Sequence, residues 1–440
     1  MGDDQSLNLT FTHHVSRFTH HVSFRKNKLT MSTERAKLSF GEFVALMALM
    51  MSLVAMSIDS MLPALADIGN DLGVARENAN QLIVTMIFLG LATGQLLYGP
   101  LSDSVGRKPA IYLGYGVFIV GTLLSIFALN FPMMLVGRLL QGIGVAAPRS
   151  VSVALIRDQY EGRAMAQVMS FIMVVFILVP IIAPSFGQAI LLVADWRAIF
   201  VALLLLGVGS LTWFALRQPE TLPASRRVPL SARRIGRGLR EVMGNHIALG
   251  YTLMAGLVSG AFQGYLSSAQ QIFQFQYELG TLFPLIFALN AVAIGLASFT
   301  NGRLVMRYGM RMLSRVALVT MCGLAVGFLA LALAMGGHPP LWLFMAYLML
   351  SFFCVGILFG NLNSMAMEPL GHIAGIGAAV VGALATFLAT PLGMVIGQAY
   401  NGTVTPLVTG FAVLGLTALA LMRWAEGSKA GAPEDVQPAV

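Results

Sequence analysis

The chain alternates between long apolar runs and short polar connections. A helix that crosses about 30 Å of membrane hydrocarbon needs about 20 apolar residues at a rise of about 1.5 Å each. Twelve runs reach this length: residues 42–66, 79–101, 109–129, 132–156, 166–193, 198–216, 247–270, 281–302, 312–335, 341–362, 374–399 and 404–423. This pattern predicts an all-α membrane protein with twelve transmembrane helices.

Composition supports that prediction. Hydrophobic residues make up 57% of the 440-residue chain and charged residues only 10%, against about 25% charged residues in soluble domains. These proportions exclude a soluble enzyme and a disordered protein. Two cysteines, Cys322 and Cys354, both within apolar runs, are too few for a disulfide framework or a thiol metal site. The net charge of +8 does not indicate nucleic-acid binding, because the basic residues lie in short loops.

Lysine and arginine are concentrated on alternate connections. If both termini face the cytoplasm, the external loops hold only Arg76 and Arg197. The positive-inside rule therefore predicts cytoplasmic termini. The basic internal segments are the N-terminal tail and the connections near residues 107–108, 157–163, 217–240, 303–315 and 423–429.

The predicted spans divide six and six around a basic connection. We expect an N-terminal bundle at 42–216, a cytoplasmic linker at 217–246 and a C-terminal bundle at 247–424, with tails at 1–41 and 425–440. The second tail is expected to be disordered. The sequence FTHHVS occurs at 11–16 and again at 18–23. Its histidine pairs suit a metal, but we favour a natural start at Met31, with residues 1–30 either upstream sequence that is not native or a dispensable tail.

A short motif recurs in the two halves. Glycine, leucine and glycine keep the same spacing at Gly99, Leu101 and Gly106 and in residues 302–309, where the second copy reads Gly302, Leu304 and Gly309. Asp103 of the first copy is replaced by Met306 in the second. Duplicated six-helix halves are typical of secondary transporters.

Several stretches resemble one transporter family. Residues 99–108 are similar to the loop motif of the major facilitator superfamily, 138–144 to the fourth-helix motif of its drug/proton antiporters, and 180–187 to their antiporter motif. Residues 57–65, 195–200 and 363–375 resemble the bicyclomycin/chloramphenicol-resistance (Bcr/CflA) family. The resemblance covers residues 42–424. It implies two pseudo-symmetric six-helix bundles that export drugs from a bacterial inner membrane.

Asp59 and Arg138 are the candidate proton-coupling residues. Each lies about six or seven residues from the outer end of its run, roughly 10 Å deep, so we expect the two side chains to meet. Burial favours a protonated acid and a nearby guanidinium favours the carboxylate, so relative movement would load or release a proton. The resemblance makes Asp59 the expected protonation site; the alternative is a static ion pair. Met51 stands where some relatives carry a second acid, so Asp59 is expected to act alone.

Other polar residues within the runs are candidates for a substrate cavity. Arg149 follows eleven residues after Arg138, about 20° beyond three full turns, so the two share a helix face. Arg149 either attracts an anionic substrate or reaches the inner headgroups. The remaining polar candidates line a cavity or form interhelical hydrogen bonds; they are Gln141, Gln263, Gln270, Asn290 and Asn361.

The resemblance also assigns gating positions. The candidate gating loop comprises Gly99, Asp103, Gly106 and Arg107, repeated at Gly302 and Gly309. Simple anchoring by basic residues is the alternative. On the fifth run, Pro180, Pro184 and Gly187 are expected to bend a helix that seals the interface between the halves, or are ordinary membrane prolines.

The sequence carries no phosphate-binding loop and no zinc-ligand spacing. We therefore expect a carrier rather than an enzyme, with no metal or cofactor and with a proton gradient as its energy source. The expected partners are the lipid bilayer, protons and a small amphipathic substrate, with the protein a monomer. An exporter or importer of a specific metabolite, for which Arg149 indicates an acidic group, is the first alternative, and a non-transporting sensor is the second.

Overall fold

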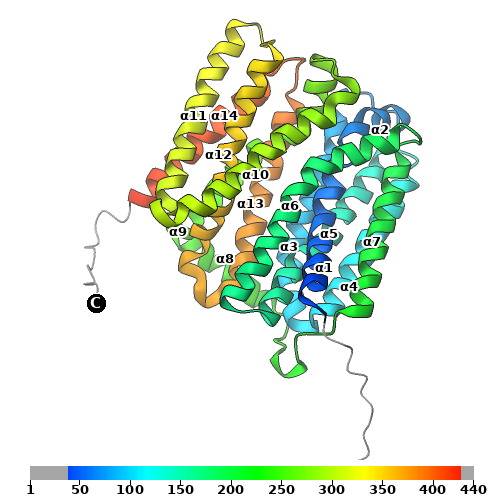
Figure 1. Ribbon diagram of the computed structural model, residues 1–440, viewed down its shortest axis with the longest axis vertical. Helices are drawn as coiled ribbons and strands as arrows, with labels where there is room; N and C mark the ends of the chain where they lie inside the picture. The colour runs from blue at the N-terminus through cyan, green and yellow to red at the C-terminus, as the bar shows by residue number, and fades with distance from the viewer. Residues whose placement is uncertain (1–37, 428–440) are drawn as a thin grey trace, which may run out of the picture. The chain divides into compact units, whose positions relative to one another are not determined.

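Helices occupy nearly every predicted apolar run in the computed structural model (Figure 1). The structure describes residues 38–427. Outside this range lie the predicted start at Met31, the histidine pairs and residues 428–440 of the predicted C-terminal tail. Residues 425–427 of that tail belong to the last helix. The helices are α1 Phe40–Asp59, α2 Leu65–Asp71, α3 Leu82–Val105, α4 Arg107–Ile126, α5 Phe131–Gln159, α6 Gly162–Leu191, α7 Arg197–Arg217, α8 Ala232–Gly244, α9 His246–Gln270, α10 Phe283–Tyr308, α11 Met310–Ala334, α12 Leu341–Met367, α13 Ala374–Gln398 and α14 Thr405–Gly427.

Within residues 38–427, eleven helical stretches are long and apolar enough to cross a membrane. One of them, Leu341–Gln398, has 58 residues. A straight helix of that length would measure about 87 Å, far more than one crossing requires. It consists of α12 and α13 joined by a 3₁₀ turn at Glu368–Ile373, so the helices supply the twelve predicted crossings.

The crossing helices form two bundles with the same internal packing. We name α1–α7 the N half and α9–α14 the C half. In the N half α1 packs on α6, α3 on α5 and α4 on α7; in the C half α9 packs on α13, α10 on α12 and α11 on α14. Each pair occupies the same place in its half. The packing thus has the pseudo-symmetry that the duplicated motif predicts.

The halves meet along two helix pairs, α3 with α13 and α6 with α10. Small residues permit the first contact: a Cβ atom on Gly99 would lie only 3.3 Å from that of Ala379. The outer side of α6 is apolar and exposed, with Phe171, Val174 and Ile182 among its uncovered side chains. Apolar surface of this extent requires a lipid environment.

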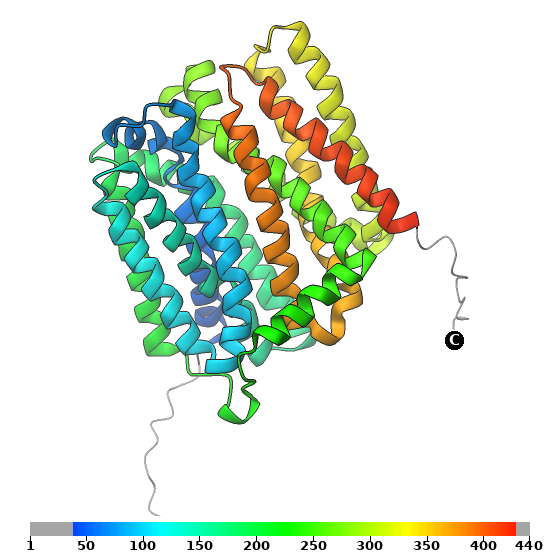
Figure 2. The same ribbon diagram turned by 180° about the vertical axis from the view of Figure 1, so that it is seen from behind.

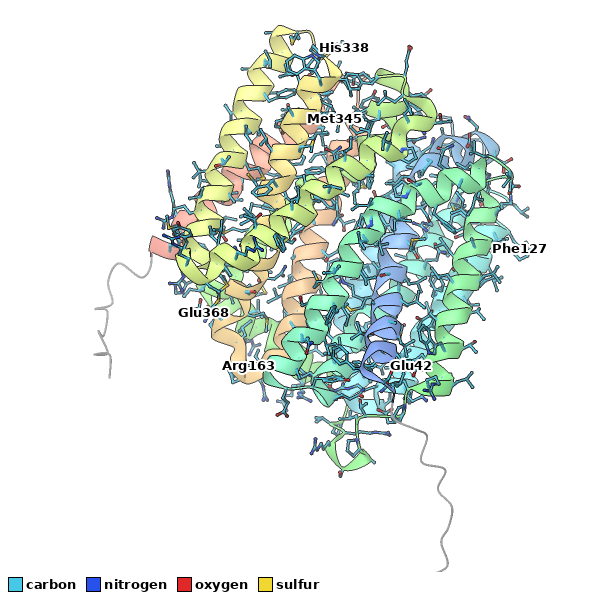
Figure 3. All side chains as sticks on the ribbon, viewed as in Figure 1. Glu42, Phe127, Arg163, His338, Met345 and Glu368 are labelled. Atoms are coloured by element: carbon cyan, nitrogen blue, oxygen red, sulfur yellow. The ribbon has the colours of Figure 1, made fainter. Side chains whose placement is uncertain are left out.

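The two ends of the helical unit differ in charge. Figure 3 shows Glu42, Arg163 and Glu368 at one end, with His338 at the other. We call the first the basic end, because it also carries the arginines of the loop at 217–246. At the basic end α8 lies against α13 and α9. The linker, predicted only as a basic connection, therefore contains a helix of its own.

Candidate functional site

Asp59 is the last residue of α1 and is buried, with 6% of its surface exposed. The helix ends there because Pro63 follows within a 3₁₀ turn, Leu62–Ala64, and proline cannot supply a backbone N–H. Among residues 38–427, the Asp59 carboxylate has no hydrogen-bond or ion-pair partner. A buried carboxyl without a partner is costly as an anion. Its position therefore suits a group that binds and releases a proton.

Arg138 is fully buried on α5 and bonds to neutral oxygens on three helices. Its Nη2 donates to the carbonyl of Ser57 at 2.8 Å, its Nη1 to Gln141 Oε1 at 2.6 Å, and its Nε to the carbonyl of Ile83 at 3.4 Å. The last carbonyls of a helix lack partners along the chain and carry partial negative charge. Arg138 thus caps the end of α1 that bears Asp59.

This arrangement differs from the expected meeting of Asp59 with Arg138. In the described part of the chain no hydrogen bond or ion pair joins the two side chains. The reason is that α1 stops at Asp59, which exposes the Ser57 carbonyl to the guanidinium. Arg138 therefore approaches Asp59 through the backbone of α1 rather than through its carboxylate.

Gly187 of α6 packs against the residue that follows Asp59. A Cβ atom at Gly187 would lie 1.7 Å from the carbonyl oxygen of Ser60, inside the radius of any real contact. Pro180 and Pro184 lie inside the same helix, which is continuous through both. The predicted antiporter stretch thus brings α6 onto the end of α1, where only glycine fits.

Across the interface, the turn that follows Asp59, Leu62–Ala64, contacts α9 of the C half. Asp59 lies within electrostatic range of Tyr265 on α9, whose hydroxyl accepts a hydrogen bond from Asn290 Nδ2 at 3.3 Å. The Tyr265 ring packs edge-on against Phe352, with centroids 4.6 Å apart, and stacks on Phe287. Tyr265 was not singled out from the sequence, since a lone tyrosine in an apolar run carries no distinguishing pattern.

The predicted cavity residues separate into two groups. Gln141 is fully buried and bridges Arg138 to Thr122, and Asn361 exchanges two hydrogen bonds with Asn301. Both therefore join helices, the alternative that the sequence left open.

The second group keeps unused polar atoms. Among the described residues, Gln270 Nε2 and Asn290 Oδ1 find no hydrogen-bond partner although both are buried, and Gln263 is buried on the same helix as Gln270. Buried polar atoms without partners are rare, and a bound ligand is one way to satisfy them. These three residues remain candidates for substrate contact.

Arg149 lies on α5, ten residues before its end at Gln159. At about 1.5 Å per residue it lies roughly 15 Å inside the helix end, beyond the reach of an arginine side chain to the headgroups. It is half-buried, and within residues 38–427 it has no ion-pair or hydrogen-bond partner. This placement favours a polar interior position over headgroup anchoring.

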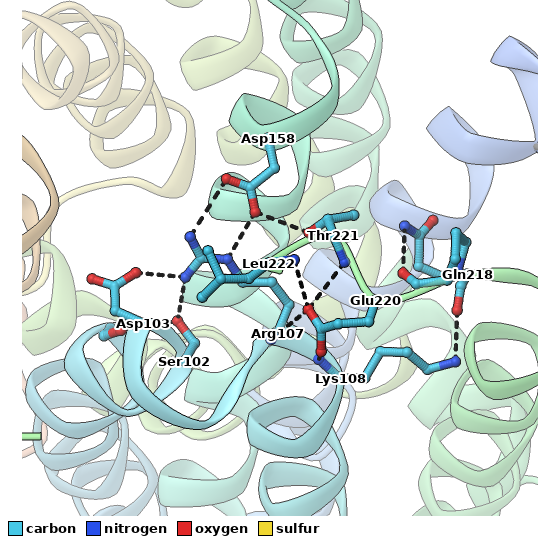
Figure 4. Close-up of polar contacts among 11 residues, drawn as sticks. Ser102, Asp103, Arg107, Lys108, Asp158, Gln218, Glu220, Thr221 and Leu222 are labelled. Atoms are coloured by element: carbon cyan, nitrogen blue, oxygen red, sulfur yellow. Dashed lines mark hydrogen bonds and ion pairs between the residues drawn. The ribbon is translucent and has the colours of Figure 1, made fainter. Parts of the chain in front are cut away.

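At the basic end, the predicted gating loop forms a network centred on Arg107 (Figure 4). The buried guanidinium donates to Asp103 Oδ1 at 2.6 Å, to Asp158 Oδ2 at 2.9 Å and to Ser102 Oγ at 3.0 Å. Asp103 also lies beside Gly375 in the first turn of α13, where the helix dipole favours an anion. The network therefore joins α3, α4 and α5 and reaches the C half.

The loop after α7 completes this network through Glu220. Glu220 accepts from the backbone N–H groups of Arg107 and Lys108, both at 3.0 Å, and so caps α4. Lys108 Nζ in turn donates to the carbonyl of Gln218 at 2.6 Å. Gly106 has φ +110°, and a side chain there would collide with Glu220. Asp158 and Glu220 were missed from the sequence, although both are acids on basic-end connections.

The second copy of the motif lacks such a network. Gly309 has a positive φ of 76° like Gly106, so the turn itself is repeated. Met306, in the place of Asp103, is 89% exposed. A Cβ atom on Gly302 or Gly309 would meet no heavy atom within 4 Å. Arg311 of this copy instead pairs with Glu368 at 3.1 Å, and both side chains are exposed.

At the opposite end, Asn78 connects the two halves. Its Nδ2 donates to the carbonyls of Gln398 and Tyr400 at 3.0 and 2.8 Å, and its Oδ1 accepts from Gln271 Nε2 at 2.7 Å. The Gln398 amide returns a bond to the Asn78 carbonyl at 2.6 Å. We call these contacts the Asn78 latch. Gln271 opens a π-helical turn, Gln271–Gln276, which extends α9 at this end.

Comparison with known proteins places this geometry in a family. The profile of the Major Facilitator Superfamily matches residues 46–394. The chain belongs to the major facilitator superfamily. The transporter fold, the duplicated halves and the resemblance carried by the sequence motifs are thereby confirmed.

Curated relatives support the finer resemblance. The chain is 29% identical over 367 residues to the uncharacterized MFS-type transporter YdgK of Bacillus subtilis, covering 83% of this chain and 89% of the relative. It is 29% identical over 378 residues to the bicyclomycin resistance protein homolog of Haemophilus influenzae, with 83% and 91% covered. It is 28% identical over 330 residues to multidrug resistance protein D of Escherichia coli, with 73% and 80% covered.

A solved structure supports the fold alone. The human organic anion transporter MFSD10 (TETRAN) aligns with a TM-score of 0.65 at 18% identity, over 88% of this chain and 100% of that chain.

Proposed function

We propose that this transporter is a proton-coupled antiporter that exports small amphipathic compounds by alternating access. The observation that carries the proposal is Asp59, a buried carboxyl at the broken end of α1, beside a turn that contacts α9 of the other half. The names of two relatives, a bicyclomycin resistance homolog and a multidrug resistance protein, favour drugs as substrates.

Asp59 is suited to coupling because its surroundings come from both halves. Burial favours the protonated acid, while contact with water or with a cation favours the carboxylate. A rocking motion that separates α1 from α9 would hydrate Asp59 and release its proton. Arg138, fixed to the Ser57 carbonyl, would tie the position of α5 to the end of α1 during that motion.

We further propose that the basic end faces the cytoplasm of a bacterial cell, as the positive-inside rule predicts. In this orientation the Arg107 network closes the cytoplasmic side and the Asn78 latch closes the external side. We expect the transporter to act as a monomer, without a metal or cofactor.

The test is transport in proteoliposomes with an imposed pH gradient. A panel of amphipathic drugs is screened for uptake driven by the gradient, and proton release on substrate addition is recorded. Asp59→Asn is expected to abolish both signals, whereas Asp67→Asn, an exposed acid beyond α1, leaves them unchanged. Undiminished gradient-driven transport in Asp59→Asn would refute the coupling role, provided that both variants elute as folded protein.

Arg149 favours a second candidate function, transport of an anionic metabolite. A half-buried guanidinium that has no partner in the described part of the chain is suited to bind a carboxylate or phosphate. Under this alternative, Arg149→Gln raises KM for an acidic substrate about tenfold or more with little change in kcat. The same variant leaves the KM of cationic drugs unchanged or lower. Screening both substrate classes with Arg149→Gln therefore separates the two functions.

A further inference from the structure

The linker helix α8 has two chemically different faces. At about 100° per residue, the residues turned toward the protein fall within an arc of about 100°; they are Ile235, Gly238, Leu239 and Val242. The basic residues fall within an arc of about 120° on the other side; they are Arg233, Arg234, Arg237 and Arg240. The helix is thus divided into an apolar face and an arginine face.

The apolar face is occupied by the transporter itself. Gly238 and Val242 are buried, and a Cβ atom on Gly238 would lie 2.4 Å from Ile376 Cγ2 on α13. Figure 2 shows α8 crossing the lower end of α13 on the surface of the molecule, just before α9 begins. The close contact fixes α8 on the bundle and turns the other face outward.

The arginine face is exposed and unpaired. All four arginines are exposed, and within residues 38–427 none has an ion-pair partner. The acid on this helix, Glu241, is engaged by His372. Four adjacent guanidinium groups therefore leave a concentrated positive charge without compensation from the protein.

The level of α8 indicates what neutralises this charge. The helix ends at Gly244, and α9, which crosses the membrane, begins two residues later at His246. Ile376, its contact on α13, lies in the first turn of another crossing helix. The arginine face thus lies where crossing helices enter the membrane, at the depth of lipid headgroups.

We propose that the arginine face of α8 is a docking site for anionic phospholipid headgroups. Guanidinium groups bind phosphate oxygens in pairs, and basic residues beside a membrane are attracted by anionic lipids. Through the contact of Gly238 with Ile376, bound lipid would hold α8 against α13, one of the helices at the interface between the halves. This inference does not depend on the transported substrate or on proton coupling.

The test is lipid binding to the purified full-length protein, measured by native mass spectrometry. The protein in detergent is titrated with phosphatidylglycerol, with zwitterionic phosphatidylcholine, and with inorganic phosphate. We expect tight retention of phosphatidylglycerol only. In the double variant Arg233→Gln/Arg237→Gln, we expect the affinity for the most strongly retained phosphatidylglycerol to fall about 25-fold. This corresponds to roughly fivefold for each arginine removed near a lipid surface.

Two matched variants define the outcome. The first, Arg303→Gln/Arg307→Gln, removes two exposed arginines from α10 at the same end and should leave the most strongly retained phosphatidylglycerol bound. The second, Arg233→Lys/Arg237→Lys, keeps the positive charge and should keep most of the binding. Equal loss in the α8 and α10 glutamine variants, or unchanged binding in both, overturns the proposal. If inorganic phosphate is retained as well as phosphatidylglycerol, the site binds a free anion. If phosphatidylglycerol is retained no better than phosphatidylcholine, an acidic soluble partner is the remaining explanation. Either result also overturns the proposal. All variants change exposed side chains, so an unchanged melting temperature establishes that they are folded.

Discussion

Gly187 on α6 lies directly against the carbonyl oxygen of Ser60, the residue that follows Asp59. The contact transmits any movement of α6 to the broken end of α1. Because α6 also packs against α10 of the C half, the candidate proton site is mechanically joined to the interface between the halves.

We therefore predict that Gly187→Ala impairs the transporter. The new methyl group overlaps a backbone atom, so α6 or the end of α1 must shift, at about 1–3 kcal/mol of folding free energy. The apparent melting temperature in detergent should fall, and gradient-driven transport should fall with it. Gly209→Ala on α7 is the control, since its added Cβ meets no heavy atom within 4 Å. Equal behaviour of the two variants would contradict the packing described here.

Substitutions of Arg138 test whether its hydrogen-bonding geometry or its positive charge is what the protein requires. Its three acceptors lie on three helices, and the compact ammonium group of lysine cannot span the same set. Arg138→Lys is therefore expected to lose about 1–3 kcal/mol of stability, as buried acceptors lose their donors, and to resemble Arg138→Gln.

The measurement is thermal unfolding of the two Arg138 variants beside Arg303→Lys, which changes an exposed arginine. If Arg138→Lys retains wild-type stability and transport, positive charge alone suffices. The hydrogen bond by which Arg138 caps α1 would then not be needed for function.

Glu220 is predicted to stabilise the basic end as a helix cap. Glu220→Ala leaves two N–H groups of α4 without their acceptor and should lower stability by about 1 kcal/mol. Glu161 stands at the N-cap of α6 but its side chain makes no capping bond. Glu161→Ala should thus have no effect in the same thermal assay, and a larger loss there than in Glu220→Ala would disprove the assignment.

The Asn78 latch predicts a change in conformational equilibrium. Asn78→Ala removes both amide donors and the acceptor for Gln271, so the end opposite the basic end should open more readily. Spin labels at Arg76 and Asn401, which are exposed on the two halves at this end, report the separation by pulsed electron resonance. We expect a new population at longer distance in Asn78→Ala and none in Glu77→Gln, its neighbour. A distance distribution identical to wild type would exclude a latch.

The fold was largely accessible from sequence because the membrane imposes a length on every apolar run. The same regularity explains the limits of that prediction. The linker helix α8 has too few apolar residues to appear as a run, and α1 ends at Asp59 although hydrophobicity continues through Leu65. Pro63 was visible in the sequence, but its consequence for the Ser57 carbonyl depends on the placement of α5.

The sequence predicted which residues form the candidate site better than it predicted which of their atoms are in contact. Asp59 and Arg138 were found because charges are rare in apolar runs, and their equal depth suggested a direct pair. Depth, however, fixes one coordinate only; rotation of each helix decides which atoms meet. Asn78 and Glu220 lie in polar loops, where nothing in the local pattern distinguishes a residue that bridges elements from one that faces solvent.

The two copies of the duplicated motif make different contacts, and this difference has a mechanical consequence. Arg107 is buried and fastens three helices of the N half, whereas beside the corresponding turn at Gly309 Met306 is exposed and Arg311 pairs with an exposed Glu368. Because exposed ion pairs contribute little to stability in water, the turn in the C half is held less firmly than the turn in the N half. We expect bending within a transport cycle to concentrate around the turn between α10 and α11, with the N half acting as the fixed frame.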